Sequence, residues 1–294
     1  MPIRTLTGAI RRRLHRQRCH FRSGHVQKAD PGQQVDCRLS KNTLNLLSFN
    51  IQVGINTQHY RHYLTRSWQH ILPHAKRVNT LDKIASVLPD YDLVALQEAD
   101  AGSIRSGFIN QTEYLALKGH FPYWYHQINR NLGKLAQHSN GLLSRIEPVS
   151  LEDHKLPGLI PGRGAIVARF GLGAETLTVV MMHLALSKRT RNIQLSYIRD
   201  LVQHCQHVVL MGDMNTHADQ LLNDSPLKDT DLHAAHWGQN TFPSWQPKRS
   251  LDHILISPSL RVNRFGVINL PITDHLPVAV EIQVPDSILI KDNW

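Results

Sequence analysis

The sequence predicts an α/β fold: a four-layer sandwich in which two packed mixed β-sheets are flanked by α-helices. Short apolar runs typical of strands outnumber the helical stripes, and most connections are too short for uniform βαβ crossovers. Two packed sheets with helices outside bury each apolar face. The chain has 294 residues, 41% of them hydrophobic, and no linker interrupts its body, so we expect one domain with a sizeable core.

In the first half of the body, short apolar runs predict strands and stripes of apolar residues predict helices. The strands are expected over residues 44–50, 92–98 and 123–128, and the helices over 75–88 and 111–119. Pro89 ends the first helix because proline cannot continue one. The strand of residues 92–98 is expected to finish on Glu98.

The second half is richer in strands, which Gly and Pro turns separate. Strands are expected over residues 140–145, 162–170, 176–186, 207–215, 251–257, 261–269 and 277–284. Helices are expected over 188–205, which carries a helical stripe, and over 218–224. Residues 241–250 are expected to form a loop.

The positive charge of the chain lies in its N-terminal tail. Residues 1–41 hold ten Lys or Arg against two Asp, which leaves only +2 of the net charge of +10 for the rest. We therefore divide the chain into a basic, flexible N-terminal extension (1–42) and a globular domain (43–294). Because the domain is nearly neutral, the overall charge does not predict that it follows a DNA backbone.

The role of the tail stays open between two interpretations. Four apolar residues recur at helical spacing among its arginines: Ile3, Leu6, Ile10 and Leu14. This pattern is typical of a basic amphipathic helix that contacts an anionic membrane or nucleic acid. The lack of acidic residues before Asp30 also resembles a mitochondrial transit peptide. The alternative is a disordered, soluble extension without a partner.

The cysteines and the lack of long apolar runs bear on the expected cellular location of the protein. None of Cys19, Cys37 and Cys205 belongs to a C-x-x-C pair, which fits a reducing environment. No apolar run approaches the roughly eighteen residues that span a bilayer. We expect a cytoplasmic protein, with peripheral membrane contact through the tail as an alternative.

Polar residues end several of the predicted strands. They are Asn50, Gln52, Glu98, His183, Asp213, Asn215, Asp252, Asp274 and His275. Carboxylates and imidazoles at the ends of buried strands cost solvation free energy unless a cation or a hydrogen-bond partner compensates them. Several such ends, joined by loops, predict one polar pocket at the edge of a sheet.

Seven segments resemble segments of the endonuclease/exonuclease/phosphatase superfamily and follow one another in the order that the superfamily has. They are LSFNIQ, LVALQE, NGLLSR, VVMMHLAL, VVLMGDMN, LDHILIS and TDHLPV, and the resemblance covers roughly residues 43–284. The superfamily includes pancreatic deoxyribonuclease, abasic-site endonucleases, neutral sphingomyelinases and inositol polyphosphate 5-phosphatases. The resemblance implies a hydrolase that uses Mg²⁺, or Mn²⁺ in its place, to cleave a phosphate ester in a nucleic acid, a phospholipid or a small phosphate. Separately, we expect a monomer.

The resemblance also implies which residues bind the metal and the substrate. Glu98 and Asn50 are expected to hold the metal, which prefers oxygen ligands, and Asp274 is expected to help hold either the metal or the adjacent His275. Asn140 and Arg163 are expected to contact phosphate, a task that the planar donors of arginine suit. A turn residue between two glycines is the alternative for Arg163.

Five residues are expected to carry the catalytic chemistry. Asp252 holds the imidazole of His275, which accepts a proton from the attacking water. Asp213 orients that water and Asn215 donates to the developing negative charge. His183 stabilises the phosphate or assists the leaving group.

Two positions depart from the family pattern. Gln52 stands where nucleases of the superfamily often carry a carboxylate, and His183 stands where abasic-site endonucleases carry a tyrosine. Gln52 leaves open a homologue that binds phosphate without turnover. Turn-capping by Asn50 and Asn215 and an exposed strand end at Glu98 are the structural alternatives.

Overall fold

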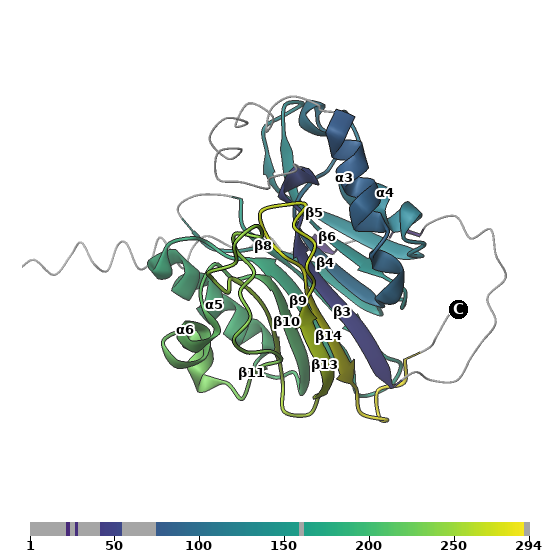
Figure 1. Cartoon of the computed structure of the whole chain (residues 1–294). Helices are drawn as coiled ribbons and strands as arrows, with labels where there is room; N and C mark the ends of the chain where they lie inside the picture. Colours follow the sequence, from purple (N-terminus) through teal and green to yellow (C-terminus); the bar gives the residue numbers. More distant parts are fainter. Residues whose placement is uncertain (1–21, 24–26, 29–41, 55–74, 159–161, 291–294) are drawn as a thin grey trace, which may run out of the picture.

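The computed structural model describes residues 22–23, 27–28, 42–54, 75–158 and 162–290. These residues form two mixed sheets of seven strands each, packed face to face with helices on their outer faces (Figure 1). The predicted four-layer α/β sandwich is confirmed.

Sheet A contains the strands that carry His183, Asp213 and Asp252. In spatial order these are β1 (Arg22–Ser23), β7 (Ser150–Lys155), β8 (Gly164–Phe170), β9 (Leu177–His183), β10 (His207–Asp213), β12 (Asp252–Ile256) and β11 (His233–Ala234). Only β9 and β10 are parallel, since helix α5 (Lys188–Val202) connects them.

Sheet B contains the strands that carry Asn50 and Glu98. In spatial order these are β13 (Arg261–Val267), β14 (Val278–Gln283), β3 (Thr43–Asn50), β4 (Leu93–Asp100), β6 (Gln137–Ser144), β5 (Tyr123–Asn131) and β2 (Gln27–Lys28). Here β3 and β4 form the parallel pair, and α3 (Ala75–Ala85) lies between them in the chain.

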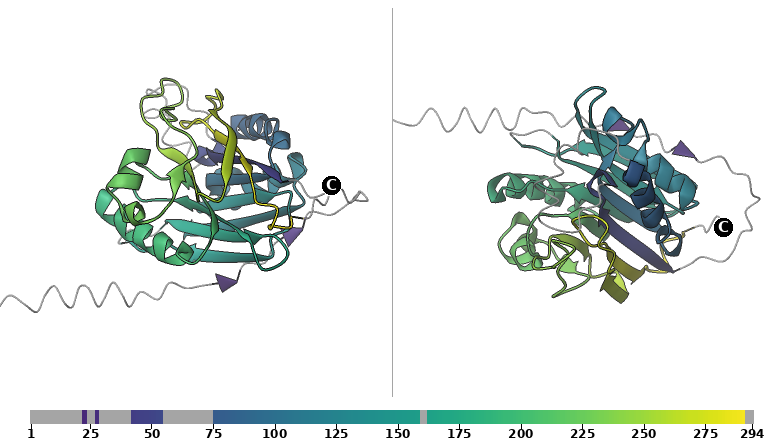
Figure 2. Two further views of the ribbon diagram at one scale, coloured as in Figure 1. Left: turned by 90° about the horizontal axis from the view of Figure 1, so that it is seen from below. Right: turned by 45° about the horizontal axis from the view of Figure 1, so that its top comes forward.

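Helices α5 and α6 (Ala218–Asn223) lie on the side of sheet A, and α3 and α4 (Gln111–Lys118) lie on the side of sheet B (Figures 1 and 2). Short 3-10 helices fill several connections: η1 (Gln52–Gly54), η3 (Leu88–Asp90), η4 (Ile104–Ser106) and η5 (Pro226–Asp229). Ser187 caps the N-terminus of α5, and its hydroxyl accepts a hydrogen bond from the backbone N–H of Thr190.

Three apolar clusters hold the layers together. The first lies between the sheets, where residues such as Leu46 of β3 pack with Val209 of β10. The second joins sheet A to α5 through Ile198, and the third joins sheet B to α3 through Ile84. Each sheet therefore has apolar residues on both faces, which explains why its central strands read as continuous apolar runs.

The structure corrects two expectations about strands. Strand β4 does not finish on Glu98 but continues to Asp100, because a bulge between Leu96 and Ala99 interrupts its pairing with β6 without ending it. Strand β7 was not expected, since its sequence SLEDHK is polar and only partly buried.

The predicted extension of residues 1–42 is described only in part. Its residues 22–23 pair with β7 and its residues 27–28 pair with β5, at the outer edge of each sheet. The predicted amphipathic helix lies outside the described residues. Within the described part of the chain, no helix has the length and apolar character that crossing a membrane requires.

Candidate active site

The polar residues at the ends of three neighbouring strands of sheet A lie in one row. His183 of β9 pairs with Asp213 of β10, and Asp213 pairs with Asp252 of β12. Residues directly opposite one another in a sheet carry their side chains on the same face. The strands approach closely because Gly212 has no side chain: a Cβ at this position would lie 1.9 Å from the carbonyl oxygen of Met182.

Asn50 joins this row to sheet B. Its side-chain amide donates a 3.0 Å hydrogen bond to Asp213 Oδ2. Its Oδ1 accepts from the backbone N–H of Gln52 at 3.1 Å, and its carbonyl oxygen accepts from the Thr273 hydroxyl at 3.1 Å. Asn50 is buried. It therefore links two sheets and does more than cap a turn.

Asp252 and His275 form the predicted acid–imidazole pair. Nδ1 of His275 lies 2.7 Å from Asp252 Oδ2, and its Nε2 lies 3.9 Å from Asp213 Oδ2. Burial acts to lower the pKa of His275, but the neighbouring carboxylates, Asp252 first, raise that pKa well above its usual value. The buried carboxylates therefore favour the charged form of the imidazole.

Thr241, which was not among the predicted site residues, holds this pair in place. Its hydroxyl donates a 2.6 Å hydrogen bond to Asp252 Oδ2, and its carbonyl oxygen accepts from the N–H of Leu276 at 2.8 Å. The ring of the next residue, Phe242, lies 4.9 Å from the ring of His275. The loop of residues 241–250 thus positions both members of the pair. A threonine in a loop carries no pattern by which the sequence alone could single it out.

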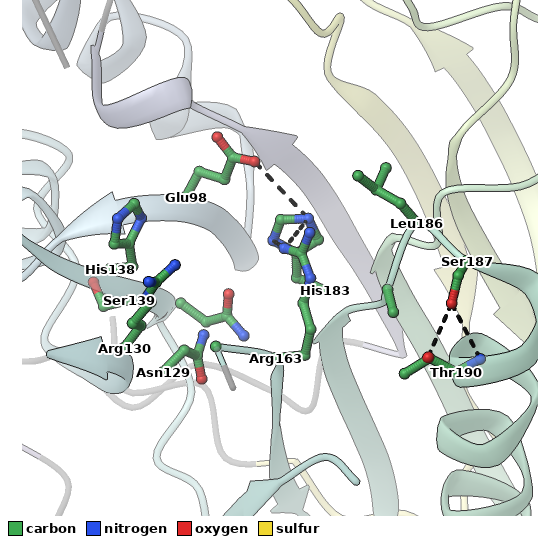
Figure 3. Close-up of a pocket in the computed structure, with 13 residues that line it drawn as sticks. Glu98, Asn129, Arg130, His138, Ser139, Arg163, His183, Leu186, Ser187 and Thr190 are labelled. Carbon is green, nitrogen blue, oxygen red and sulfur yellow. Dashed lines mark hydrogen bonds and ion pairs between the residues drawn. The ribbon is translucent and has the colours of Figure 1, made fainter. Parts of the chain in front are cut away.

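Glu98 lies at the bulge of β4 with a left-handed backbone, at a φ of 55°. Gln52 and Asn215 have the same kind of backbone, with φ of 44° and 53°. Left-handed residues other than glycine cost conformational free energy and gather at functional sites. The bulge directs the Glu98 carboxylate to within 3.9 Å of His183 Nε2 (Figure 3).

Glu98 and His183 line a cleft of about 580 Å³, together with Arg163 and Asn140 (Figure 3). A guanidinium nitrogen of Arg163 lies 2.6 Å from Nε2 and 2.8 Å from Nδ1 of His183. Arginine can donate only to a ring nitrogen that has no proton. Burial and then the charge of Arg163 lower the pKa of His183 well below its usual value, so both observations indicate a neutral imidazole.

The two remaining asparagines are engaged with the backbone. Asn140 is fully buried, and its amide donates to the carbonyl oxygen of Gly164 at 3.1 Å, next to Arg163. Asn215 donates to the carbonyl oxygen of Leu184, directly after His183, at 2.9 Å. Part of the role of each is therefore to hold the strand end that carries a neighbouring site residue.

The centre of the site holds more negative than positive charge. Burial raises the pKa of Asp213 to about 6, although the charge of His275 opposes this. Burial also raises the pKa of Asp274 to about 7, and Oδ1 of Asp274 has no hydrogen-bond partner among the described residues. Buried carboxylates that retain protons for lack of counter-charge are suited to a cation.

Among the described residues, the group whose spacing would allow a shared ion consists of Asp213, Asp252 and His275. This group differs from the predicted metal set of Asn50, Glu98 and Asp274. Since His275 Nδ1 and Asp252 Oδ2 already satisfy each other at 2.7 Å, we interpret their closeness as a hydrogen bond. Asn50, Glu98 and Asp274 each offer an oxygen atom, the ligand that Mg²⁺ prefers, and their binding of a metal remains a prediction.

The structure brings every predicted site residue to this one region. Four of them surround Asp213: Asn50, His183, Asp252 and His275. Two more, Glu98 and Arg163, contact His183. The others adjoin these residues; they are Asp274, Asn140 and Asn215. Gln52 is also buried here, and its Oε1 has no partner among the described residues. The individual roles of these residues remain predictions.

Residues 47–275 match the family model described as the endonuclease/exonuclease/phosphatase family. No curated protein matches the sequence. Solved structures share the fold. An endonuclease/exonuclease/phosphatase from Beutenbergia cavernae is 18% identical, with 84% of this chain and 73% of that chain covered and a TM-score of 0.61.

Two further structures resemble the chain equally well. The mannosyl-6-phosphatase of Bacteroides thetaiotaomicron is 18% identical, with 81% of this chain and 99% of that chain covered and a TM-score of 0.58. TDP2 of D. rerio, complexed with a single-strand DNA product, is 15% identical, with 82% and 99% covered and a TM-score of 0.59. At these identities the similarity supports the fold alone.

Proposed function

Because the chain belongs to the endonuclease/exonuclease/phosphatase family, whose members are hydrolases of phosphate esters, we propose that it is a phosphodiesterase that depends on Mg²⁺ or Mn²⁺. The observation that supports this most is the buried sequence of contacts from Asp252 through His275 to Asp213, beside a cleft that Glu98 and His183 line. This arrangement offers a proton acceptor, a water-orienting carboxylate and a place for phosphate.

Glu98, Asn50 and Asp274 are the residues that would hold the cation. The unpaired Oδ1 and the raised pKa of Asp274 support this set, since both indicate missing positive charge. Among the residues that the structure describes, Asn50 Oδ1 accepts one hydrogen bond, from Gln52, which leaves its second lone pair available. When bound, the cation neutralises phosphate oxygens and offsets the excess of carboxylates.

In this proposal the proton of the attacking water goes to His275, which must first be neutral; the cation, when bound, would offset the neighbouring carboxylates that otherwise favour the charged imidazole. Asp252 fixes Nδ1–H, which leaves Nε2 as the acceptor. Nε2 lies 3.9 Å from Asp213 Oδ2, so one water can contact both atoms. The three carboxylates around His275 stabilise the imidazolium that forms.

The phosphate is held from the opposite side. Arg163 supplies charge, and neutral His183 supplies an N–H toward the phosphate or the leaving oxygen. One amide hydrogen of Asn215 is donated to the carbonyl oxygen of Leu184. The other is available for the negative charge that develops on the phosphate.

An activity panel tests the proposal. It compares plasmid DNA, abasic DNA, single-stranded RNA, sphingomyelin and inositol phosphates, each with Mg²⁺ and with EDTA. His275→Ala, prepared in parallel, excludes contaminating enzymes. Activity that needs the metal and is lost in the variant supports the proposal, whereas no activity on any substrate contradicts it. A monomeric state, a cytoplasmic location and contact of the tail with a membrane or nucleic acid remain predictions.

A further inference from the structure

Three strongly exposed hydrophobic side chains lie in the cleft or in segments that adjoin it. Leu186, which lines the cleft, is 76% exposed, and Phe108 is 67% exposed. Leu135, at the tip of the β5–β6 hairpin, is 57% exposed. Isolated surface leucines need no explanation, but several around one cleft indicate a contact surface.

These side chains come from three segments that we call the cleft mouth: residues 104–108, 128–136 and 184–190. The first two are joined, because the N–H groups of Ile104 and Arg105 donate to the carbonyl oxygens of Lys134 and Leu135 at 2.8 and 3.2 Å. The third lies across the cleft. Figure 3 shows Arg130, of the second segment, and Leu186, of the third, on opposite sides of the cavity.

The cleft mouth is also positively charged. Arg130 and Lys134 are exposed on one side, and Lys188 and Arg189 are exposed on the other. Residues 101–112, 128–138 and 184–199 contain no Asp or Glu. The domain as a whole is nearly neutral, so this segregation of charge is local. It favours an anionic partner that extends across both sides of the cleft.

We infer that the cleft mouth docks on an anionic phospholipid surface and that the substrate is a phosphodiester presented by such a surface. Exposed leucines flanked by Lys and Arg match the boundary between acyl chains and charged headgroups. A single-stranded nucleic acid would instead be held by several exposed aromatic rings, and Phe108 is the only large exposed ring in the described residues of the cleft mouth. The identification of the substrate rests on the proposed function; the docking does not.

Vesicle binding by the full-length protein tests this inference. The probes are vesicles of phosphatidylcholine alone and vesicles that also contain phosphatidylserine. The triple variant Phe108→Ser/Leu135→Ser/Leu186→Ser is expected to bind the anionic vesicles at least about tenfold more weakly than the wild type. The double variant Lys134→Glu/Lys188→Glu is expected to lose the preference for phosphatidylserine.

A matched control uses a different apolar patch among the described residues. Val149, Leu172 and Leu289 line a different pocket and are 43–56% exposed. Leu172 follows the end of β8 that is remote from Gly164 and the cleft. Val149→Ser/Leu172→Ser/Leu289→Ser is expected to bind vesicles like the wild type. The basic tail is present in all of these proteins, so their differences report on the cleft mouth.

Three results would overturn the inference. They are equal vesicle binding by the triple variant and the wild type, an equal loss in the control variant, and weakened binding of a single-stranded oligonucleotide with vesicle binding unchanged. His275→Ala is expected to bind vesicles normally. A wild type that binds vesicles through the cleft mouth but cleaves no phosphodiester would therefore refute the proposed function and leave the docking intact.

Discussion

The amide of Asn50 and the carboxylate of Asp213 form a 3.0 Å hydrogen bond that connects the two sheets across 163 positions of the sequence. Both side chains are buried at the last residue of their strands. Because the bond spans the interface between sheets, the site forms only when the sandwich has closed.

Asn50→Ala should weaken both activity and stability. The substitution leaves the buried Asp213 carboxylate without its amide donor, which should cost about 1–3 kcal/mol of unfolding free energy. We expect activity to fall at least about a hundredfold, since Asp213 also loses its orientation. Urea unfolding and steady-state kinetics measure the two effects. Asn42→Ala, directly before the same strand, is the control for the kinetics, and unchanged kinetics in Asn50→Ala would contradict the role of Asn50.

His275→Ala should lower kcat by about a thousandfold or more, because it removes the proton acceptor of a cooperative site. Asp252→Asn should cause a comparable loss, since the amide no longer stabilises the imidazolium. The exposed His204 provides a matched control, as His204→Ala should keep wild-type activity. A His275→Ala enzyme with normal kcat on the best substrate of the panel would refute the assignment.

Thr241→Val should lower kcat without a comparable change in KM. The variant keeps the shape of the side chain but removes the 2.6 Å hydrogen bond to Asp252. We expect a loss of about tenfold and a shift in the pH dependence of kcat, because the charge on Asp252 sets the pKa of His275. Thr241→Ser should restore both. If Thr241→Val changed only thermal stability, Thr241 would be purely structural.

Removal of the metal should abolish activity, and Glu98→Gln should weaken metal binding. A ligand that binds only the folded state raises the Tm with its concentration. We expect millimolar-range Mg²⁺ titration to raise the Tm of the wild type more than that of Glu98→Gln. Glu113→Gln, an exposed carboxylate on α4, is the control. Identical Tm responses in Glu98→Gln and the wild type would exclude Glu98 as a ligand.

The contribution of His236 to stability should fall as the pH decreases from about 6.5 toward 4. Burial, and next the proximity of His253, lowers the pKa of His236 to about 4. Below pH 6.5 the unfolded chain therefore binds a proton at this position that the folded protein does not. Lowering the pH thus stabilises the unfolded state relative to the folded state. Chemical unfolding at several pH values measures the slope. His236→Phe should make the slope shallower, and an unchanged slope would show that His236 does not contribute.

The sequence alone revealed the strand ends and the residues they carry. The apolar runs that end on Asn50, His183 and Asp213 are local patterns, and burial on both faces of each sheet makes such runs continuous. The ordered segments around these residues also identified the family. Strand β7 was not predicted from the sequence, because polar residues interrupt the apolar pattern of this strand near the edge of sheet A.

Only the tertiary structure decided how these residues meet. The register of β9, β10 and β12 aligns His183 with Asp213 and Asp252, and the bulge in β4 turns Glu98 toward them. Thr241 acquires its role only because its loop packs against both Asp252 and Leu276. The physical reason is that an apolar run reflects burial of neighbouring residues, whereas a hydrogen bond between distant residues depends on how two sheets pack.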